Sequence, residues 1–137
     1  MTERISIEQV VARERGDVWR FFNEPEHIVN WNFATDDWRC PRAENDLRAG
    51  GRLCARMEAK DGSFGFDFEA VYDEVEHDVK LAYTMTDGRQ AETSFEDVEG
   101  GTRVSTTFDA EQENPAEMQR AGWQAILDNF KKYAESA

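Results

Sequence analysis

Paired carboxylates are the first residues in this sequence whose types and spacing suggest chemistry. Asp36 and Asp37 are adjacent, and Glu44 and Asp46 follow in the same stretch. Neighbouring carboxylates raise one another's pKa, so such a group could act as a general acid or base, or bind a cation. The chain has 29 acidic residues, however, so clusters are expected by chance and solvation is the simpler interpretation. Asp36 and Asp37 are weak catalytic candidates, and no catalytic residue is assigned.

The histidines and cysteines do not form a catalytic or metal-binding motif. His27 and His77 are the only imidazoles, Cys40 and Cys54 are the only thiols, and their spacing matches neither CxxC nor HExxH. We therefore expect no metal site, two reduced cysteines, a structural Cys40, and both histidines at the surface. The sequence also contains no Walker, Rossmann, EF-hand or GxSxG motif, and no cofactor is predicted.

Aromatic and other apolar side chains recur at strand or helix spacing and could line a pocket. Apolar walls with a few polar groups are what small-molecule sites require, although the same pattern also describes an ordinary core. A glycine inside a helix costs about 1 kcal/mol relative to alanine, so we expect Gly122, on the inner face, to leave room for a close strand or a ligand, close packing being the simpler explanation. The candidate cavity residues are Trp31, Phe33, Trp38, Met57, Phe66, Phe68, Tyr83, Phe95, Phe108, Gly122, Trp123 and Ile126.

A long amphipathic helix is predicted from Pro115 to about Glu135. Asn114 is the predicted N-cap, Pro115 suits the first helical position, and Glu117 completes a capping box. Apolar residues gather on one side of this helix and charged residues on the other. Burial of its large apolar side chains should contribute roughly 1.5–3 kcal/mol each, so the helix requires a large apolar partner surface.

The preceding sequence predicts a sheet that supplies this surface. Alternation over residues 4–12 predicts a strand, and two short helices follow, one opened by Gly16 and one from Pro25 to Ile28. The stretch 31–49 contains Pro41 and is predicted to be a long loop. Further alternating runs between glycine turns predict about five or six strands in a meander, so the fold class is α+β, with an antiparallel sheet of about six or seven strands around the long helix.

Length and charge indicate one acidic domain. A chain of 137 residues is long enough for one core and too short for two ordinary domains. The net charge of −13 would repel phosphate backbones and anionic lipids, so neither nucleic acid nor membrane is an expected partner. The N-terminus lacks the basic start and apolar core of a signal peptide, and no segment has the length of a membrane span. These two features predict a cytoplasmic protein.

Several segments resemble a known family. Residues 25–28 with Trp31, and residues 46–52, resemble motifs of the SRPBCC superfamily, which includes START and Bet v-like proteins and has the helix-grip fold. Residues 31–41, 57–64 and 122–130 resemble one branch, the homologues of the activator of heat-shock-protein-90 ATPase. The resemblance covers nearly the whole chain as a single domain of residues 1–137. It implies a cavity between the sheet and the long helix, which the superfamily uses for lipids, sterols, polyketides and other apolar molecules.

Three functions are compatible with these sequence patterns and with the family resemblance. The first is binding of an apolar or amphipathic small molecule, lipid-like or polyketide-like, with residues 31–38 as a lid. The second is a co-chaperone-like interaction protein whose acidic surface docks on a chaperone ATPase, although this sequence lacks the N-terminal domain of the eukaryotic co-chaperone. The third is a cyclase or hydrolase with Asp36 as base, for which no constellation is identifiable. The sequence indicates neither the ligand nor the oligomeric state.

Overall fold

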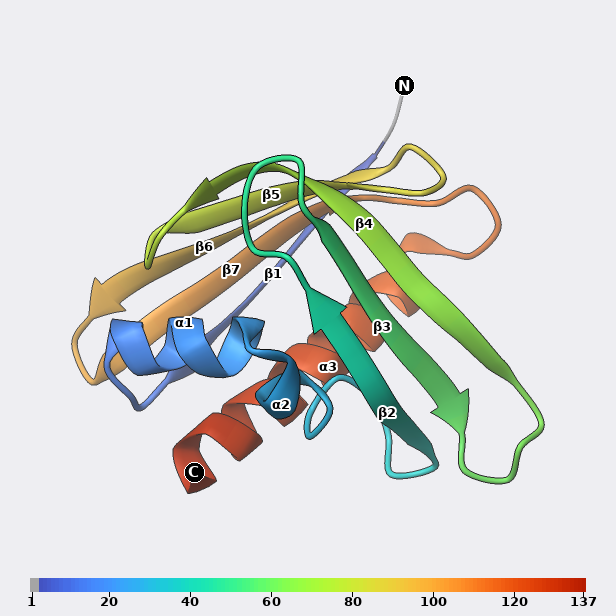
Figure 1. Ribbon diagram of the computed structural model, residues 1–137, viewed down its shortest axis with the longest axis horizontal. Coiled ribbons are helices and arrows are strands. Elements are labelled where there is room, and N and C mark those ends of the chain that lie inside the picture. Colours follow the sequence, from blue (N-terminus) through green and yellow to red (C-terminus); the bar gives the residue numbers. More distant parts are fainter. Residues whose placement is uncertain (1–2) are drawn as a thin grey trace.

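The computed structural model describes residues 3–137 and shows a curved sheet wrapped around a long helix (Figure 1). The helices are α1 (Arg15–Asn23), α2 (Pro25–Ile28) and α3 (Ala116–Ser136). The strands are β1 (Arg4–Val11), β2 (Trp38–Asn45), β3 (Arg52–Ala59), β4 (Gly65–Glu76), β5 (Lys80–Met85), β6 (Gln90–Val98) and β7 (Gly101–Asp109). The predicted first strand and both short helices are confirmed.

The seven strands form one antiparallel sheet in the order β1-β7-β6-β5-β4-β3-β2. Strands β2 to β7 form a meander. The last strand of the meander, β7, pairs with β1, which is one edge of the sheet. Helix α3 crosses the concave side of this sheet, and α1 and α2 lie near its C-terminal half (Figure 1). This arrangement confirms the predicted α+β class and helix-grip fold.

The core lies between the concave face of the sheet and α3. Strand residues at alternate positions point inward, among them Leu81 and Val104, which are almost completely buried. Phe130 is the most enclosed large side chain of α3, and its ring meets Trp31 and Phe22 at centroid distances of 4.9 and 5.2 Å in edge-to-face geometry. Burial of the apolar side of α3 thus joins the helix to the sheet and to the residues around α1 and α2.

The polar side of α3 covers the open edge of β1. Arg120 Nη1 donates to the carbonyl of Ser6 at 2.7 Å, and Lys131 Nζ donates to the carbonyl of Val10 at 2.7 Å. Gln124 Nε2 also reaches the carbonyl of Glu8 at 3.3 Å. An edge strand exposes unpaired backbone groups, so these side chains satisfy three carbonyls that no further strand covers.

The predicted loop over residues 31–49 is wrong in its second half, because residues 38–45 form edge strand β2. The pairing of β2 with β3 shifts register between Arg39 and Arg42, so Cys40 and Pro41 lie in a bulge. Proline has no amide donor and is tolerated at a bulge in an edge strand. The bulge also breaks the regular alternation by which the other strands were predicted.

The predicted cap of the last helix is also wrong. Pro115 occupies the N-cap without a side-chain hydrogen bond, and Asn114 bonds to Glu111 instead. The side chain of Gln119 holds this helix start from the inside. Its Oε1 accepts the amide of Glu111 at 2.8 Å, and its Nε2 donates to the carbonyl of Asn114 at 2.7 Å. A buried glutamine therefore fixes the loop that a capping box was expected to fix.

Replacing Phe130 with alanine should test the importance of α3 burial. We expect Phe130→Ala to lower the free energy of unfolding by about 3–5 kcal/mol, because it empties a fully buried aromatic site. Urea unfolding monitored by circular dichroism measures the loss. Lys132→Ala, at an exposed position of the same helix, should change stability by less than about 0.5 kcal/mol. A loss below about 1 kcal/mol for Phe130→Ala would contradict this description of the core.

Candidate functional site: the cavity beneath the long helix

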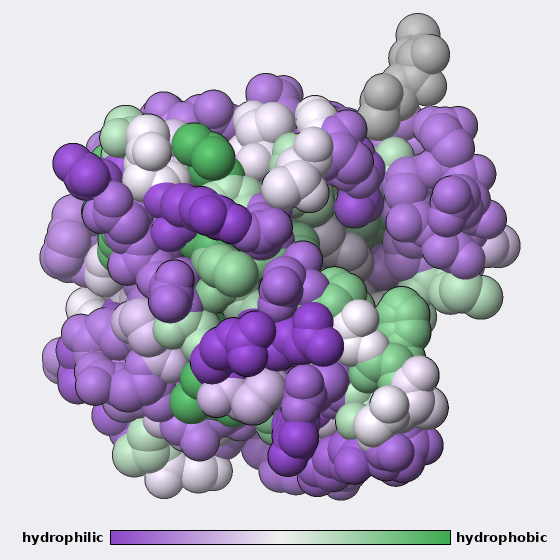
Figure 2. All heavy atoms as spheres, turned by 45° about the vertical axis from the view of Figure 1, so that its right-hand side comes forward, coloured by the Kyte–Doolittle hydropathy of each residue, from purple (hydrophilic) through white to green (hydrophobic). Residues whose placement is uncertain are grey.

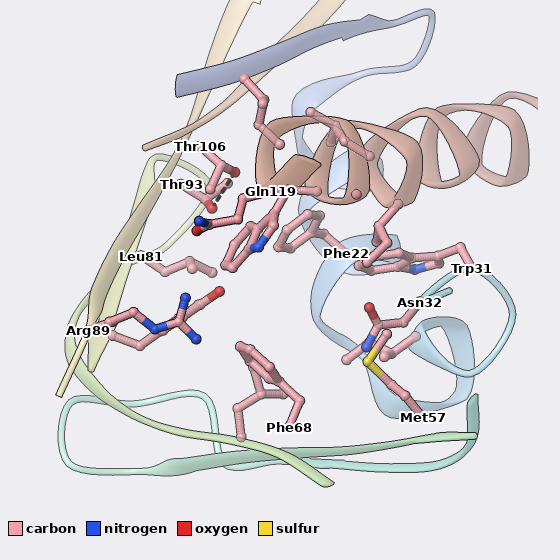
Figure 3. Close-up of a pocket in the computed structure, with 18 of the residues that line it drawn as sticks. Phe22, Trp31, Asn32, Met57, Phe68, Leu81, Arg89, Thr93, Thr106 and Gln119 are labelled. Carbon is pink, nitrogen blue, oxygen red and sulfur yellow. Dashed lines mark hydrogen bonds between the residues drawn. The ribbon is translucent and has the colours of Figure 1, made fainter. Parts of the chain in front are cut away.

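A cavity of about 450 Å³ lies between the concave side of the sheet and the first half of α3. In Figure 3, Gln119 lies on the helix side of the cavity and Phe68 lies on the sheet opposite. Most of the wall is aromatic or aliphatic, and this volume lies within the range of small-molecule sites. The residues described here therefore enclose a space that could take a small organic molecule.

The cavity reaches the surface beside the start of α3. Phe66 on β4 and Met118 on the first turn of α3 both border it, although they are 41% and 60% exposed. Figure 2 shows this side of the molecule, where apolar surface is visible in a hollow between hydrophilic side chains. Exposed apolar groups at a cavity mouth offer an apolar molecule contact before it is enclosed.

The best-fixed wall of the cavity is the indole of Trp123. Its ring stacks on Phe108 with a centroid distance of 3.9 Å and an interplanar angle of 9°. Phe108 is fully buried in β7, so it supports the indole from behind and leaves the other side of Trp123 toward the cavity. Phe68 approaches the same indole edge-on at 6.5 Å. Aromatic contacts of this kind hold the wall in one conformation.

Most polar groups at the cavity wall are bonded to one another. The hydroxyls of Thr93 and Thr106 lie 2.8 Å apart, and Figure 3 shows this pair near Gln119. Tyr72 donates its hydroxyl hydrogen to Asn45 Oδ1 at 2.8 Å, and Asn45 Nδ2 donates to the carbonyl of Asn23 at 2.7 Å. These paired groups do not need a ligand to satisfy them.

The twelve candidate residues separate into two sets in the structure. Eight border the cavity: Trp31, Met57, Phe66, Phe68, Tyr83, Gly122, Trp123 and Ile126. Four do not border it: Phe33, Trp38, Phe95 and Phe108. Whether any of the eight contacts a ligand stays a prediction.

The four remaining candidates have structural surroundings that explain their positions. Trp38 packs beside Phe66 at a centroid distance of 6.1 Å, next to the cavity rather than at its wall. Phe95 is buried against Trp19 of α1 at 5.1 Å, and Phe108 lies behind Trp123. The carbonyl of Phe33 accepts a long 3.4 Å hydrogen bond from Asn129, which joins the segment before β2 to α3. For Phe95 and Phe108, alternation along the strand identified an inward position, but it could not show how deep each side chain lies.

The weak catalytic candidates Asp36 and Asp37 lie apart from the cavity. Both are exposed in the segment before β2, and neither borders the cavity. The carbonyl of Asp37 accepts the amide of Lys60 at 2.8 Å, an ordinary backbone contact. The structure thus offers no support for the cyclase or hydrolase alternative at these residues.

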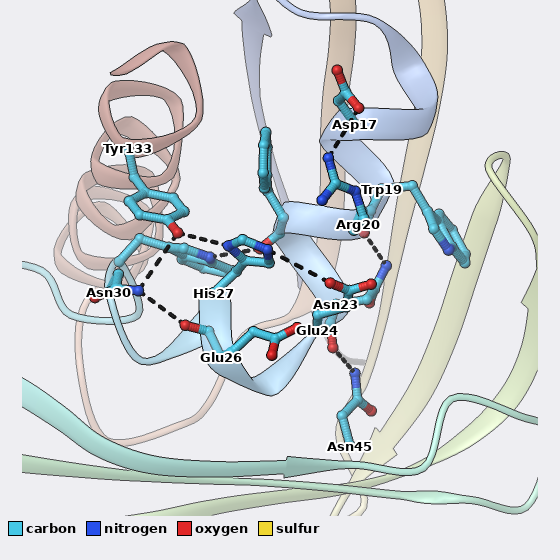
Figure 4. Close-up of polar contacts among 12 residues, drawn as sticks. Asp17, Trp19, Arg20, Asn23, Glu24, Glu26, His27, Asn30, Asn45 and Tyr133 are labelled. Carbon is cyan, nitrogen blue, oxygen red and sulfur yellow. Dashed lines mark hydrogen bonds and ion pairs between the residues drawn. The ribbon is translucent and has the colours of Figure 1, made fainter. Parts of the chain in front are cut away.

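His27 takes part in a polar cluster at the α2–α3 contact (Figure 4). Its Nδ1 lies 2.7 Å from the Tyr133 hydroxyl, and its Nε2 lies 3.6 Å from Glu24. Glu24, Glu26 and His27 bring possible metal ligand atoms within 4.8 Å of one another. The bond to Tyr133 and packing of the ring on Phe21 at 4.8 Å explain the position of His27 without an ion. Its side chain is 20% exposed, so this histidine lies at the surface only in part.

The cysteines are both free, as expected. Cys40 is buried in the β2 bulge, and burial raises the pKa of its thiol to about 11. A thiol with so high a pKa is almost entirely protonated near neutral pH and is a poor nucleophile. Its environment supports a structural role.

Sequence reasoning missed several cavity residues. Thr93 and Thr106 lie at buried, inward strand positions, and a polar residue at such a position is a usable signal. Gln119 is a single buried polar residue in the helix, which is a weaker signal. Arg89 borders the cavity from the Asp87–Gly88 turn, where no periodicity points inward.

Comparisons with known proteins identify the class. A family model described as "Activator of Hsp90 ATPase homolog 1-like protein" matches residues 12–135. The chain belongs to this family, within the SRPBCC superfamily. The comparison with curated proteins gives no match.

Solved structures agree with this assignment. The solution structure of an AHSA1-like protein from Aeromonas hydrophila is 46% identical, with a TM-score of 0.92 over 98% of this chain and 93% of that one. A solution structure from Cytophaga hutchinsonii is 44% identical, with a TM-score of 0.84 over 97% and 92%. A crystal structure from Nitrosomonas europaea, at 20% identity and a TM-score of 0.84 over 97% and 94%, shows the same fold.

Alanine at position 122 should stabilise the protein. A Cβ added to Gly122 meets nothing within 4 Å, so this glycine borders open space and the close-packing explanation is wrong. Gly122→Ala should therefore raise the free energy of unfolding by about 0.5–1 kcal/mol through helix propensity. Gly51→Ala is the matched contrast, because its Cβ would lie 2.0 Å from the Asp46 carbonyl oxygen and should destabilise. Urea unfolding of both variants would contradict this description if Gly122→Ala were the more damaging change.

The two cysteines should differ in reactivity. At pH 8.5 roughly 1% or less of Cys40 should be thiolate, so iodoacetamide should label Cys54 at least tenfold faster. Peptide mass spectrometry over a time course measures both rates in one sample. Equal labelling of the folded protein would contradict the buried environment of Cys40.

Proposed function

We propose that this protein binds an apolar or amphipathic small molecule in the cavity beneath α3. The observation that carries the proposal is the roughly 450 Å³ space with apolar walls and an opening beside α3. Sites for small molecules are concave and mostly apolar, with a few polar groups that fix orientation. The stacked pair of Trp123 and Phe108 supports the proposal, because a wall that is already ordered costs little to order on binding.

The segment between α2 and β2 would act as a boundary of the site rather than as a free flap. Trp31 is buried, and its indole donates to the carbonyl of Phe21 at 2.9 Å. Asn129 Nδ2 donates to the carbonyl of Trp31 at 2.9 Å and attaches the same segment to α3. The mouth beside Phe66 and Met118 is therefore the proposed route of entry.

Filling the cavity from Gly122 tests the proposal. Gly122→Leu would project a side chain into the space beside the helix, and it should reduce the affinity for the neutral dye Nile red at least tenfold. Ala121→Leu adds a side chain of the same kind at an exposed position of α3 and should leave the affinity unchanged. Fluorescence titration measures both, with circular dichroism as a folding control. Equal dye affinity for the two variants, or no binding by the starting protein, would contradict the proposal.

A second candidate function is a co-chaperone-like interaction. It is favoured by the family description, which names an activator of the Hsp90 ATPase, and by the net charge of −13. An acidic surface would accelerate association with a basic partner, and the association rate would fall as salt increases. Binding of this kind would use the outer surface and would be insensitive to Gly122→Leu, which separates it from the first proposal.

A further inference from the structure

The cavity has one positively charged wall residue in the part of the chain described here, Arg89. Glu111 is the only other charged residue at the wall, and the remaining residues are apolar or neutral. A guanidinium beside a mostly apolar space is costly unless it has partners. The hydrogen-bond partners of Arg89 therefore bear on the chemical class of ligand that the cavity would bind.

Asp87 fixes the guanidinium without using its outer nitrogens. Asp87 Oδ2 accepts Arg89 Nε at 2.7 Å, and Oδ1 accepts the Arg89 amide at 3.1 Å. Within residues 3–137, neither terminal nitrogen of Arg89 has a hydrogen-bond partner. Figure 3 shows the guanidinium extending from the β5–β6 turn into the cavity. The two terminal nitrogens form the donor fork that binds carboxylates in bidentate fashion.

Tyr83 supplies a neighbouring hydroxyl. Its side chain is buried and borders the same cavity, and its hydroxyl has no partner among the described residues. Burial raises the pKa of Tyr83 well above its usual value, and the charge of Arg89 opposes that rise. The phenol therefore stays neutral and keeps a hydrogen to donate.

The opposite part of the cavity is suited to an apolar body. In Figure 3, Arg89 lies on one side, and Trp31 and Met57 lie on the other. Phe68 and Trp123 border the space between them. A molecule that spans the cavity would place one end at the guanidinium and the rest against aromatic side chains.

On this geometry, and resting on the proposed function, we propose that the ligand is an apolar monocarboxylic acid. Its carboxylate accepts hydrogen bonds from the terminal nitrogens of Arg89 and from the Tyr83 hydroxyl, while its body lies against Trp123 and Phe68. Asp87 already offsets part of the charge of Arg89. Asp109 also lies near Arg89, and the guanidinium helps to lower the pKa of the Asp109 carboxyl. These acidic neighbours favour a single negative charge over a phosphate dianion.

Calorimetric titration with a matched series tests this assignment. The probes are straight-chain acids from octanoic to tetradecanoic acid, each compared with its methyl ester and the corresponding alcohol. The folded protein should bind the acid about tenfold or more tightly than the ester of the same length. Arg89→Gln should remove that preference, Arg89→Lys should retain part of it, and Tyr83→Phe should lose about threefold in acid affinity.

Arg103→Gln is the matched control. Arg103 lies on β7 at a part-exposed position, pairs with Glu96 at 3.1 Å, and does not border the cavity. It should keep the preference for the acid. If esters and alcohols bind as tightly as acids and Arg89→Gln changes nothing, the carboxylate assignment is overturned while the binding function stands. If no member of the series binds, both fall.

Discussion

Burial of one side of α3 is the constraint on which the rest of this structure depends. An amphipathic helix of 21 residues exposes a large apolar stripe unless another surface covers it, and the concave sheet is that surface. The polar side of the same helix binds carbonyls of β1 and so covers an edge of the sheet. Both sides of α3 thus contact the sheet, the apolar side on its concave face and the polar side on β1. These contacts fix the distance and direction of α3 relative to the strands.

The cavity follows from this fixed position. The C-terminal half of α3 is tightly packed around Phe130, whereas the first half carries Gly122 and leaves space above the sheet. A void of this size costs free energy when it serves only packing. The void has an aromatic wall, Trp123 stacked on Phe108, and hydrogen-bond donors of Arg89 and Tyr83 that have no partner among residues 3–137. A site for an amphipathic molecule accounts for these features together.

Much of the fold could be predicted from the sequence because its signals are local. Alternation identified six of the strands, and helical periodicity identified α3 within about one residue at each end. Strand β2 was missed because the bulge at Cys40 and Pro41 interrupts alternation. The N-cap of α3 was predicted wrongly because the Gln119 side chain replaces the expected capping box.

The site was less predictable because it depends on depth and on contacts between distant residues. Phe108 and Tyr83 are both inward-facing on their strands, yet one lies behind Trp123 and the other borders the cavity. Arg89 follows a turn, so only the folded hairpin brings it to the cavity. Resemblance to the family supplied the expectation of a cavity, but it could not identify Arg89, which gives the wall a positive charge.

Whether the cavity beneath α3 holds a small molecule can be tested by native mass spectrometry of the protein purified gently from its own host, followed by extraction and identification of retained small molecules. We expect a reproducible bound species with an apolar body, present in the starting protein and in Ala121→Leu but absent from Gly122→Leu. A clean unbound mass for the starting protein from several growth conditions would contradict it.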